Sequence, residues 1–284
     1  MIRASRPGDE AGLKELWQAA FGDPPTAIEG FFSHLYQVGT AVVWDEDGVI
    51  ASAIYLLDAG ITPLPDGHPL RTAYAYALGT LPAYRGRGIG SEVTRACITR
   101  SFELGFDCNV ICPAEESLFP YYVRLGYDAV LPITEDKIIH TIQTELSITS
   151  KIMSTDPSTY FHLRSTLLPT CAATYAESYL QYVSFVCQAS GGGLYQLELN
   201  GQTACAAVER RGETGLFIRE FLPTSLSEVG IRALLSHFAA ESADFRAPAS
   251  DVPPALKQRP FALAAYAGEQ TIPCGDGYFP FVLD

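Results

Sequence analysis

Apolar residues recur along this chain at helical spacing in some stretches and at strand spacing in others. Apolar positions three and four residues apart predict helices, and alternating or short continuous apolar runs between turn residues predict strands. In the first half, strands are predicted at residues 2–4, 40–44, 49–57, 71–78, 108–112 and 127–131, and helices at residues 9–21, 28–35, 89–104 and 117–126. Asp9 is the expected N-cap of the first helix.

The second half repeats this order of elements. Residues 137–148 are rich in strand-forming side chains, and the polar segment 154–158 is taken as the boundary between two domains. The elements predicted beyond it are helices at 160–168 and 175–186, a hairpin at 194–209 with the turn Asn200-Gly201, a strand at 215–222, a helix opened by a capping box at 225–228, and a strand at 243–246. The pattern therefore predicts an α/β fold, an α+β mixed sheet that is duplicated, with domains at residues 1–150 and 151–284.

Composition and charge narrow the class of protein. The chain has 284 residues, of which 48% are hydrophobic and 18% charged, and this is typical of a globular protein with one large or two small domains. Its 19 Lys plus Arg against 32 Asp plus Glu give a net charge of −13. Such a surface repels phosphate backbones, which argues against nucleic-acid binding, and it favours cationic partners.

Membrane insertion and metal binding are not indicated. No apolar run approaches the roughly 20 residues that cross a bilayer, and the first residues lack the apolar core of a signal peptide, so we expect a cytoplasmic protein. The seven cysteines form no Cys-x-x-Cys pair and have no His at metal-ligand spacing. We expect reduced, mostly buried thiols and no metal site.

A glycine-rich turn carries the clearest chemical signal. Residues 85–90 read Arg-Gly-Arg-Gly-Ile-Gly between a predicted strand and a predicted helix. Glycines let backbone approach a ligand, and the unpaired N–H groups of a helix start can hold a pyrophosphate. A dinucleotide-binding motif read from Gly86 would need glycine at Ser91, and a P-loop would need Gly-Lys-Ser/Thr, which is absent.

The same turn fits the pattern (Arg/Gln)-x-x-Gly-x-(Gly/Ala) of the GNAT superfamily of N-acetyltransferases. Tyr122-Val-Arg-Leu-Gly-Tyr127 resembles a later family segment, and the resemblance covers residues 1 to about 135. The two-part layout resembles bacterial enhanced-intracellular-survival-type acetyltransferases, shortened, in which a degenerate GNAT-like domain follows the active one. Residues 223–228 lack glycine and include Glu228, so we expect no second coenzyme site.

The resemblance implies that acetyl-CoA is the acyl donor. It assigns the pantetheine arm to the backbone of 78–80 and the pyrophosphate to the turn and the helix start. The implied coenzyme-binding residues are Leu78, Gly79, Thr80, Arg85, Gly86, Arg87, Gly88, Ile89, Gly90 and Ser91.

The sequence offers a candidate for the catalytic acid and several candidates for the general base. Tyr122 occupies the family position whose hydroxyl protonates the departing thiolate, with Tyr121 or a packing role as alternatives. The predicted strand 71–78 contains no carboxylate to act as general base. Glu115 and its neighbour Glu116 are candidates, the group resembled suggests the terminal carboxylate of Asp284, and a water relay is equally open.

These observations predict an N-acetyltransferase that moves an acetyl group directly to a primary amine of a small cationic molecule. A non-catalytic acyl-CoA sensor or scaffold, and an acetyltransferase of protein lysines or N-termini, are the alternatives. The acceptor, the acyl chain length and the oligomeric state, including a homo-oligomer, stay open.

Overall fold

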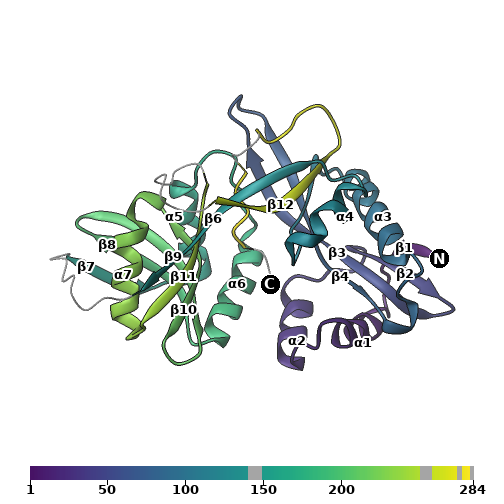
Figure 1. The fold of residues 1–284 in the computed structure, drawn as a ribbon, viewed down its shortest axis with the longest axis horizontal. Helices are drawn as coiled ribbons and strands as arrows, with labels where there is room; N and C mark the ends of the chain where they lie inside the picture. Colours follow the sequence, from purple (N-terminus) through teal and green to yellow (C-terminus); the bar gives the residue numbers. More distant parts are fainter. Residues whose placement is uncertain (140–148, 250–257, 274–276, 282–284) are drawn as a thin grey trace. The chain divides into compact units, whose positions relative to one another are not determined.

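The computed structural model describes residues 1–139, 149–249, 258–273 and 277–281 (Figure 1). Contacts between Cα atoms divide the described chain into two compact units. The first consists of residues 1–130 and 261–272, and the second of the described residues in 131–260 and 273–281. Each unit contains a mixed sheet with helices on both faces, which confirms the predicted α/β class (Figure 1).

The first unit has the strand order β1-β2-β3-β4-β5-β12. Neighbouring strands are antiparallel except β4 and β5, which are parallel. Helices α1 and α2 cover one face of the sheet, and α3 and α4 cover the other (Figure 1). The elements are β1 (Ile2–Ala4), α1 (Glu10–Phe21), α2 (Pro25–His34), β2 (Ala41–Glu46), β3 (Val49–Pro63), β4 (Pro69–Thr80), the 3-10 turn η1 (Pro82–Tyr84), α3 (Ile89–Glu103), β5 (Cys108–Ile111), the 3-10 turn η2 (Glu116–Leu118), α4 (Phe119–Val123) and β12 (Gln258–Tyr266).

The second unit repeats this plan with the order β7-β8-β9-β10-β11-β6. Again one neighbouring pair, β10 and β11, is parallel, and the other described pairs are antiparallel. Helices α5 and α6 pack on one face and α7 on the other. The elements are β6 (Ala129–Ile139), β7 (Ser150–Ser154), α5 (Pro157–Leu167), α6 (Glu177–Ala189), β8 (Gly193–Leu199), β9 (Gln202–Arg211), β10 (Gly215–Leu222), the 3-10 turn η3 (Thr224–Leu226), α7 (Ser227–Phe238) and β11 (Ser242–Ala247).

The strand beside each parallel pair comes from an unexpected part of the chain. A plain duplication would pair the strand that follows α4 with β5, but this strand, β6, pairs with β11. The partner of β5 is β12, from near the end of the chain, in a register that sets Leu263 opposite Ile111. The compact units therefore differ from the division at residue 150 that the sequence predicts.

In two stretches of the chain, the secondary structure differs from the prediction. No strand is predicted at 258–266, because this segment is rich in alanine, which is a weak strand former. The predicted strand 137–148 overlaps the end of β6, and residues 140–148 lie outside the described residues. The polar segment 154–158 connects β7 to α5 within the second unit.

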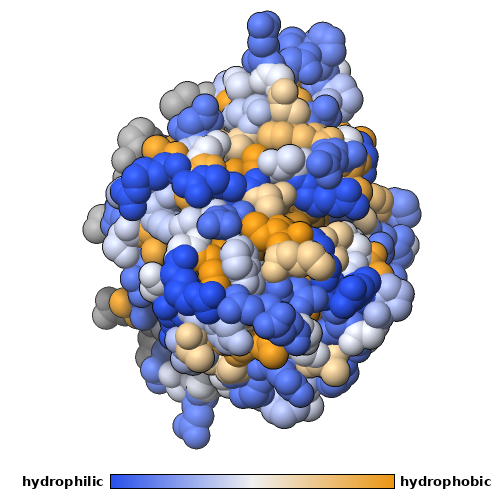
Figure 2. Space-filling view, turned by 90° about the vertical axis from the view of Figure 1, so that its right-hand side faces the viewer, coloured by the Kyte–Doolittle hydropathy of each residue, from blue (hydrophilic) through white to orange (hydrophobic). Residues whose placement is uncertain are grey.

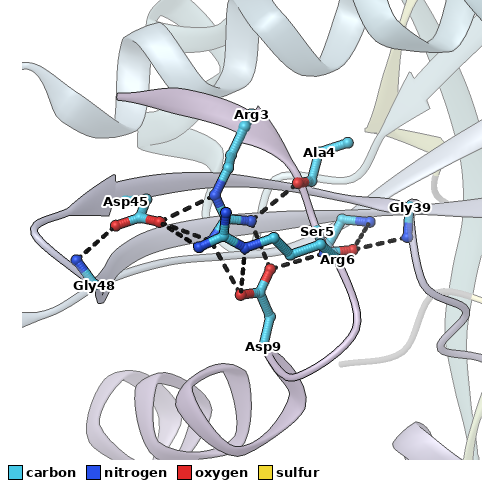
Figure 3. Close-up of polar contacts among 9 residues, drawn as sticks. Arg3, Ala4, Ser5, Arg6, Asp9, Gly39, Asp45 and Gly48 are labelled. Carbon is cyan, nitrogen blue, oxygen red and sulfur yellow. Dashed lines mark hydrogen bonds and ion pairs between the residues drawn. The ribbon is translucent and has the colours of Figure 1, made fainter.

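An ion-pair network joins the first strand to the β2–β3 turn and to the start of α1 (Figure 3). Arg3 donates to Asp9 at 2.6 Å and to Asp45 at 2.8 Å. The Asp9 carboxylate also accepts from the backbone N–H of Arg6, and Asp45 accepts from that of Gly48. Asp9 precedes α1 as predicted, but its side chain caps no helical N–H group, because these other donors occupy it.

The predicted capping box at 225–228 is wrong. The 3-10 turn η3 occupies residues 224–226, so α7 begins at Ser227 and its N-cap residue, Leu226, has no side-chain acceptor. Glu228 instead forms an ion pair with Arg232 one turn later, at 3.2 Å.

Each unit has its own apolar core, and the surface combines hydrophilic and hydrophobic side chains. In the first unit the core between α3, α4 and the sheet includes Val93, Ile111 and Tyr127. Hydrophilic side chains cover much of the face shown in Figure 2, interrupted by hydrophobic patches. No helix in the described part of the chain is both long and apolar enough to cross a bilayer. Among the described cysteines, Cys112 is half-buried and the others are buried, as expected.

Candidate active site

Strand β4 has a bulge that opens the sheet of the first unit. Ala53 of β3 is paired with Gly79 and Tyr55 is paired with Tyr76, so β4 contains one extra residue between these pairs. Ala77, in this bulge, has a φ of 53°. The described pairing of β4 with β5 ends at Ala75. Beyond this point the β5-facing backbone groups of β4 can bind an extended ligand as an added strand would.

The glycine-rich turn follows the open end of β4 after the short 3-10 turn η1. Gly86 and Gly88 have φ values of 76° and 79°, which side-chain-bearing residues rarely adopt. Gly88 is the N-cap of α3 and its carbonyl accepts from the N–H of Ser91 at 3.0 Å. The N–H groups ahead of Ser91 point out of the helix start, so this end of α3 presents donors and the positive end of the helix dipole.

A cleft of about 190 Å³ lies at this helix start. It is lined by Thr80, Tyr84, Arg85, Gly86, Gly88, Ile89, Gly90, Ser91 and Tyr121. Most of the residues predicted to bind a pyrophosphate are therefore brought together around one space. An anion can bind there through backbone donors, with one guanidinium nearby.

The two arginines of the turn are placed differently. Arg85 lines the cleft, and its Nε donates to the carbonyl of Thr80 at 3.0 Å, which folds the turn back onto β4. The Arg87 side chain binds the carboxylate of Glu46 at 3.0 Å and lies over the ring of Tyr84. A hydrogen bond from Trp44 and the ion pair with Arg87 lower the pKa of Glu46. Arg87 is therefore paired with a carboxylate that the sequence did not suggest.

The predicted pantetheine-binding residues, 78–80, contact both β3 and α1. Ser52 donates to the carbonyl of Gly79 at 2.7 Å, and its oxygen lies 2.9 Å from the hydroxyl oxygen of Thr80. A Cβ atom on Gly79 would lie 3.1 Å from the Cβ of Ala20, so glycine permits the close approach of α1. Leu78 packs against the core under α3.

Tyr121 and Tyr122 are adjacent on α4 but have different surroundings. Tyr122 is 7% exposed and packs in the core beside Tyr127, with ring centroids 6.1 Å apart. Burial raises the pKa of Tyr122 to about 12, so its phenol stays protonated at neutral pH. Tyr121 is partly exposed, lines the cleft and hydrogen-bonds with Ser91. Tyr127 is a packing residue, as predicted, whose hydroxyl donates to Asn109 at 2.8 Å.

Of the candidate general bases, Glu115 and Glu116 do not line the cleft. Glu115 is exposed at the start of η2, and its carboxylate accepts from the hydroxyl of Ser117 at 3.2 Å. Glu116 is also exposed. Asp284 lies outside the described residues, so its terminal carboxylate stays a prediction.

Sequence reasoning missed Tyr84 and Glu46, and it considered Tyr121 only as an alternative to Tyr122 as the acid. Tyr84 lines the cleft, Tyr121 contributes a hydroxyl to it, and Glu46 binds Arg87. Tyr84 stands directly before the motif, and this position in the sequence could have indicated that it lines the cleft. Glu46 lies in an acidic stretch that is typical of a hairpin turn, and its contact with Arg87, 41 positions away, leaves no local pattern.

The corresponding region of the second unit has other chemistry. Strand β10 also contains a bulge, between Ile218 and Glu220. There, the fully buried Glu220 carboxylate binds Arg164 at 2.8 Å and accepts from the hydroxyl of Tyr160. The turn before α7 has no glycine, and exposed Glu228 lies in the first turn of the helix, where a carboxylate opposes anion binding.

Comparison with known proteins agrees with this geometry. Residues 1–130 match the family model described as an acetyltransferase (GNAT) domain. No match is found among the curated proteins. Over 93% of this chain and 72% of the other, the fold is similar to a GCN5-related N-acetyltransferase from Anabaena variabilis, with a TM-score of 0.70 and 14% identity.

Two further solved structures extend over nearly the whole chain. Eis1 from Mycobacterium abscessus has a TM-score of 0.67 and 14% identity, with coverage of 94% of this chain and 73% of its own. A tandem GNAT protein from the clavulanic acid biosynthesis pathway has a TM-score of 0.55 and 14% identity, with coverage of 95% and 100%. Residues 1–130, which contain the bulged β4 and the glycine turn at α3, thus match the GNAT acetyltransferase domain, and the fold of the whole chain is similar to that of a tandem GNAT protein.

Proposed function

We propose that this protein is an acetyl-CoA-dependent N-acetyltransferase that acts on a primary amine of a small cationic acceptor. The observation that carries the proposal is the cleft at the start of α3, which opens beside the unpaired end of β4. Backbone donors and Arg85 bind the diphosphate of the coenzyme, and the open edge of β4 binds the pantetheine arm by strand addition.

The chain's own residues supply the rest of the transfer. The neutral amine nitrogen attacks the thioester carbonyl carbon, and a backbone N–H of the bulge stabilises the oxyanion. As the C–S bond breaks, Tyr122 donates its phenolic proton to the departing sulfur. The attacking nitrogen loses its proton to a base, for which the terminal carboxylate of Asp284, Glu115 and a water relay are candidates.

The charge of the molecule supports a cationic acceptor. A net charge of −13 attracts cations over distances of about a Debye length, about 8 Å at physiological salt. The same field disfavours the polyanionic coenzyme. Coenzyme binding must therefore rely on local donors, which the glycine turn and α3 provide.

A two-stage experiment tests the proposal. Isothermal titration with acetyl-CoA measures binding, and a thiol-release assay with a panel of polyamines, other small amines and lysine peptides then measures transfer. We expect saturable binding, turnover with small cationic amines, and loss of turnover in Tyr122→Phe. Absence of acetyl-CoA binding would refute the proposal.

A non-catalytic acyl-CoA sensor is the second candidate, and one observation favours it. Residues 71–78 of β4 contain no carboxylate, and Glu115 is bound within its own turn. Binding of acetyl-CoA without turnover on any acceptor in the panel would support the sensor. Turnover on peptides alone would instead indicate a protein acetyltransferase.

A further inference from the structure

Two hydroxyl groups from separate elements meet at the wall of the cleft. Ser91 lies in the first turn of α3, and Tyr121 lies in α4, thirty positions later in the chain. The Ser91 Oγ donates to the phenolic oxygen of Tyr121 at 3.1 Å. Both residues line the cleft.

This hydrogen bond leaves the proton of Tyr121 available. A phenol has one proton to donate, and Ser91 occupies a lone pair of the oxygen rather than that proton. Within the described ranges no acceptor for the Tyr121 proton is found. The neighbouring ring of Tyr122 packs edge-to-face against the Tyr121 ring, with the centroids 5.0 Å apart.

The hydroxyl is also close to the backbone that binds the anion. A Cβ atom on Gly90 would lie 3.7 Å from the Tyr121 oxygen and 3.6 Å from the Thr80 hydroxyl oxygen. Glycine at position 90 therefore leaves the phenol, the threonine and the start of α3 around one space. Donors that converge at the positive end of a helix favour a phosphate oxygen over a neutral group.

We propose that Tyr121 donates its phenolic proton in a hydrogen bond to a diphosphate oxygen of the coenzyme. This inference rests on the proposed function, because it identifies a further contact of the same coenzyme site. Ser91 is the positioning residue that holds the Tyr121 oxygen. Tyr121 thus sets coenzyme affinity, whereas the adjacent Tyr122 serves the chemical step.

Calorimetric titration of the full chain with three ligands tests the assignment. CoA and dephospho-CoA contain the diphosphate, and pantetheine does not. We expect Tyr121→Phe to weaken CoA and dephospho-CoA about tenfold, the loss typical of a hydrogen bond to a charged acceptor, and to leave pantetheine unchanged. The KM for acetyl-CoA should rise by a similar factor with kcat unchanged. Tyr195→Phe in the second unit is the matched control and should change none of these values.

A double-mutant cycle tests the role of Ser91. Ser91→Ala should also weaken CoA, and the loss in the double variant should be smaller than the product of the two single losses, because the residues act as a pair. Thermal unfolding of each variant checks that the fold is retained.

Three results would overturn the assignment: equal CoA affinity in wild type and Tyr121→Phe, an equal loss with pantetheine, or a fall in kcat at saturating acetyl-CoA. A wild-type chain that binds none of the three ligands would contradict the proposed function itself. If the wild-type chain binds CoA and one of the three results above is found, only the assignment of Tyr121 fails.

Discussion

The guanidinium of Arg87 lies 3.0 Å from the carboxylate of Glu46, although the two residues come from the α3 turn and the end of β2. Trp44 donates to the same carboxylate at 2.9 Å. The pair offsets part of the positive charge of Arg87, and Arg85 is the arginine that lines the cleft.

The two arginines should therefore contribute unequally to coenzyme binding. We expect Arg85→Ala to weaken CoA about tenfold and Arg87→Ala only about twofold, because the second charge is already paired. Calorimetric titration at low and high salt measures both. A larger loss for Arg87→Ala would show that Arg87 exchanges Glu46 for the coenzyme on binding.

The positive φ of Gly88 should be essential to the cleft. Alanine at a left-handed position costs about 1–2 kcal/mol, and relief of this strain would move the N–H groups of the turn. We expect Gly88→Ala to lower the affinity for CoA at least tenfold, about 1.4 kcal/mol. Gly67→Ala is the control, since Gly67 has a φ of 85° in an exposed turn. The two variants should lose similar stability in thermal unfolding, while Gly67→Ala keeps wild-type affinity.

Removal of the Tyr122 hydroxyl should affect the chemical step alone. Loss of a general acid typically lowers kcat by about 10²–10⁴, so we expect Tyr122→Phe to do so without changing the Kd for acetyl-CoA. Single-turnover kinetics and titration separate the two effects. Tyr127→Phe is the control: it loses a buried hydrogen bond to Asn109 and should lose stability but keep kcat. Unchanged kcat in Tyr122→Phe would assign the acid to another group.

Stability should fall in acid through Asp9 and Asp45. Hydrogen bonds from Arg3 lower the pKa of both carboxyls below their ordinary value of 3.8. The folded state therefore binds these protons more weakly than the unfolded state, so the stabilisation is complete above the ordinary pKa and is lost as pH falls through the lowered one. Urea unfolding between pH 6 and pH 2.5 should show this loss, and Arg3→Met should flatten it. An equally steep fall in Arg3→Met would place the effect elsewhere.

Removal of one charge from the buried ion pair of the second unit should strongly lower the stability of the fold. Arg164 and Glu220 are 1% and 0% exposed, so Glu220→Gln leaves an unpaired buried charge at a cost of about 3–5 kcal/mol. Glu228→Gln, which breaks the exposed pair with Arg232, should cost less than about 0.5 kcal/mol. Urea unfolding of both variants gives the comparison. Similar costs would mean that water or other groups compensate Arg164.

Tertiary contacts decided the partner of each strand. The predicted strand 108–112 corresponds to β5, and the predicted strand 127–131 overlaps the start of β6. Nothing local indicates that β6 pairs with β11, or that β5 pairs with β12, about 155 positions away. Hydrogen-bonding edges of strands are interchangeable over short segments, so the pairing depends on which edges are covered when the whole chain collapses.

The sequence by itself determined the anion turn and the helix behind it. Glycines at 86 and 88 and apolar positions at helical spacing after Ile89 act within a few residues, so they specify this local structure wherever it lies in the fold. The structure alone decided that Glu46 binds Arg87 and that Tyr121 shares the cleft with Ser91. These contacts join residues thirty to forty positions apart, and only the folded sheet, which sets the distance between its strands and helices, brings such side chains within hydrogen-bond reach.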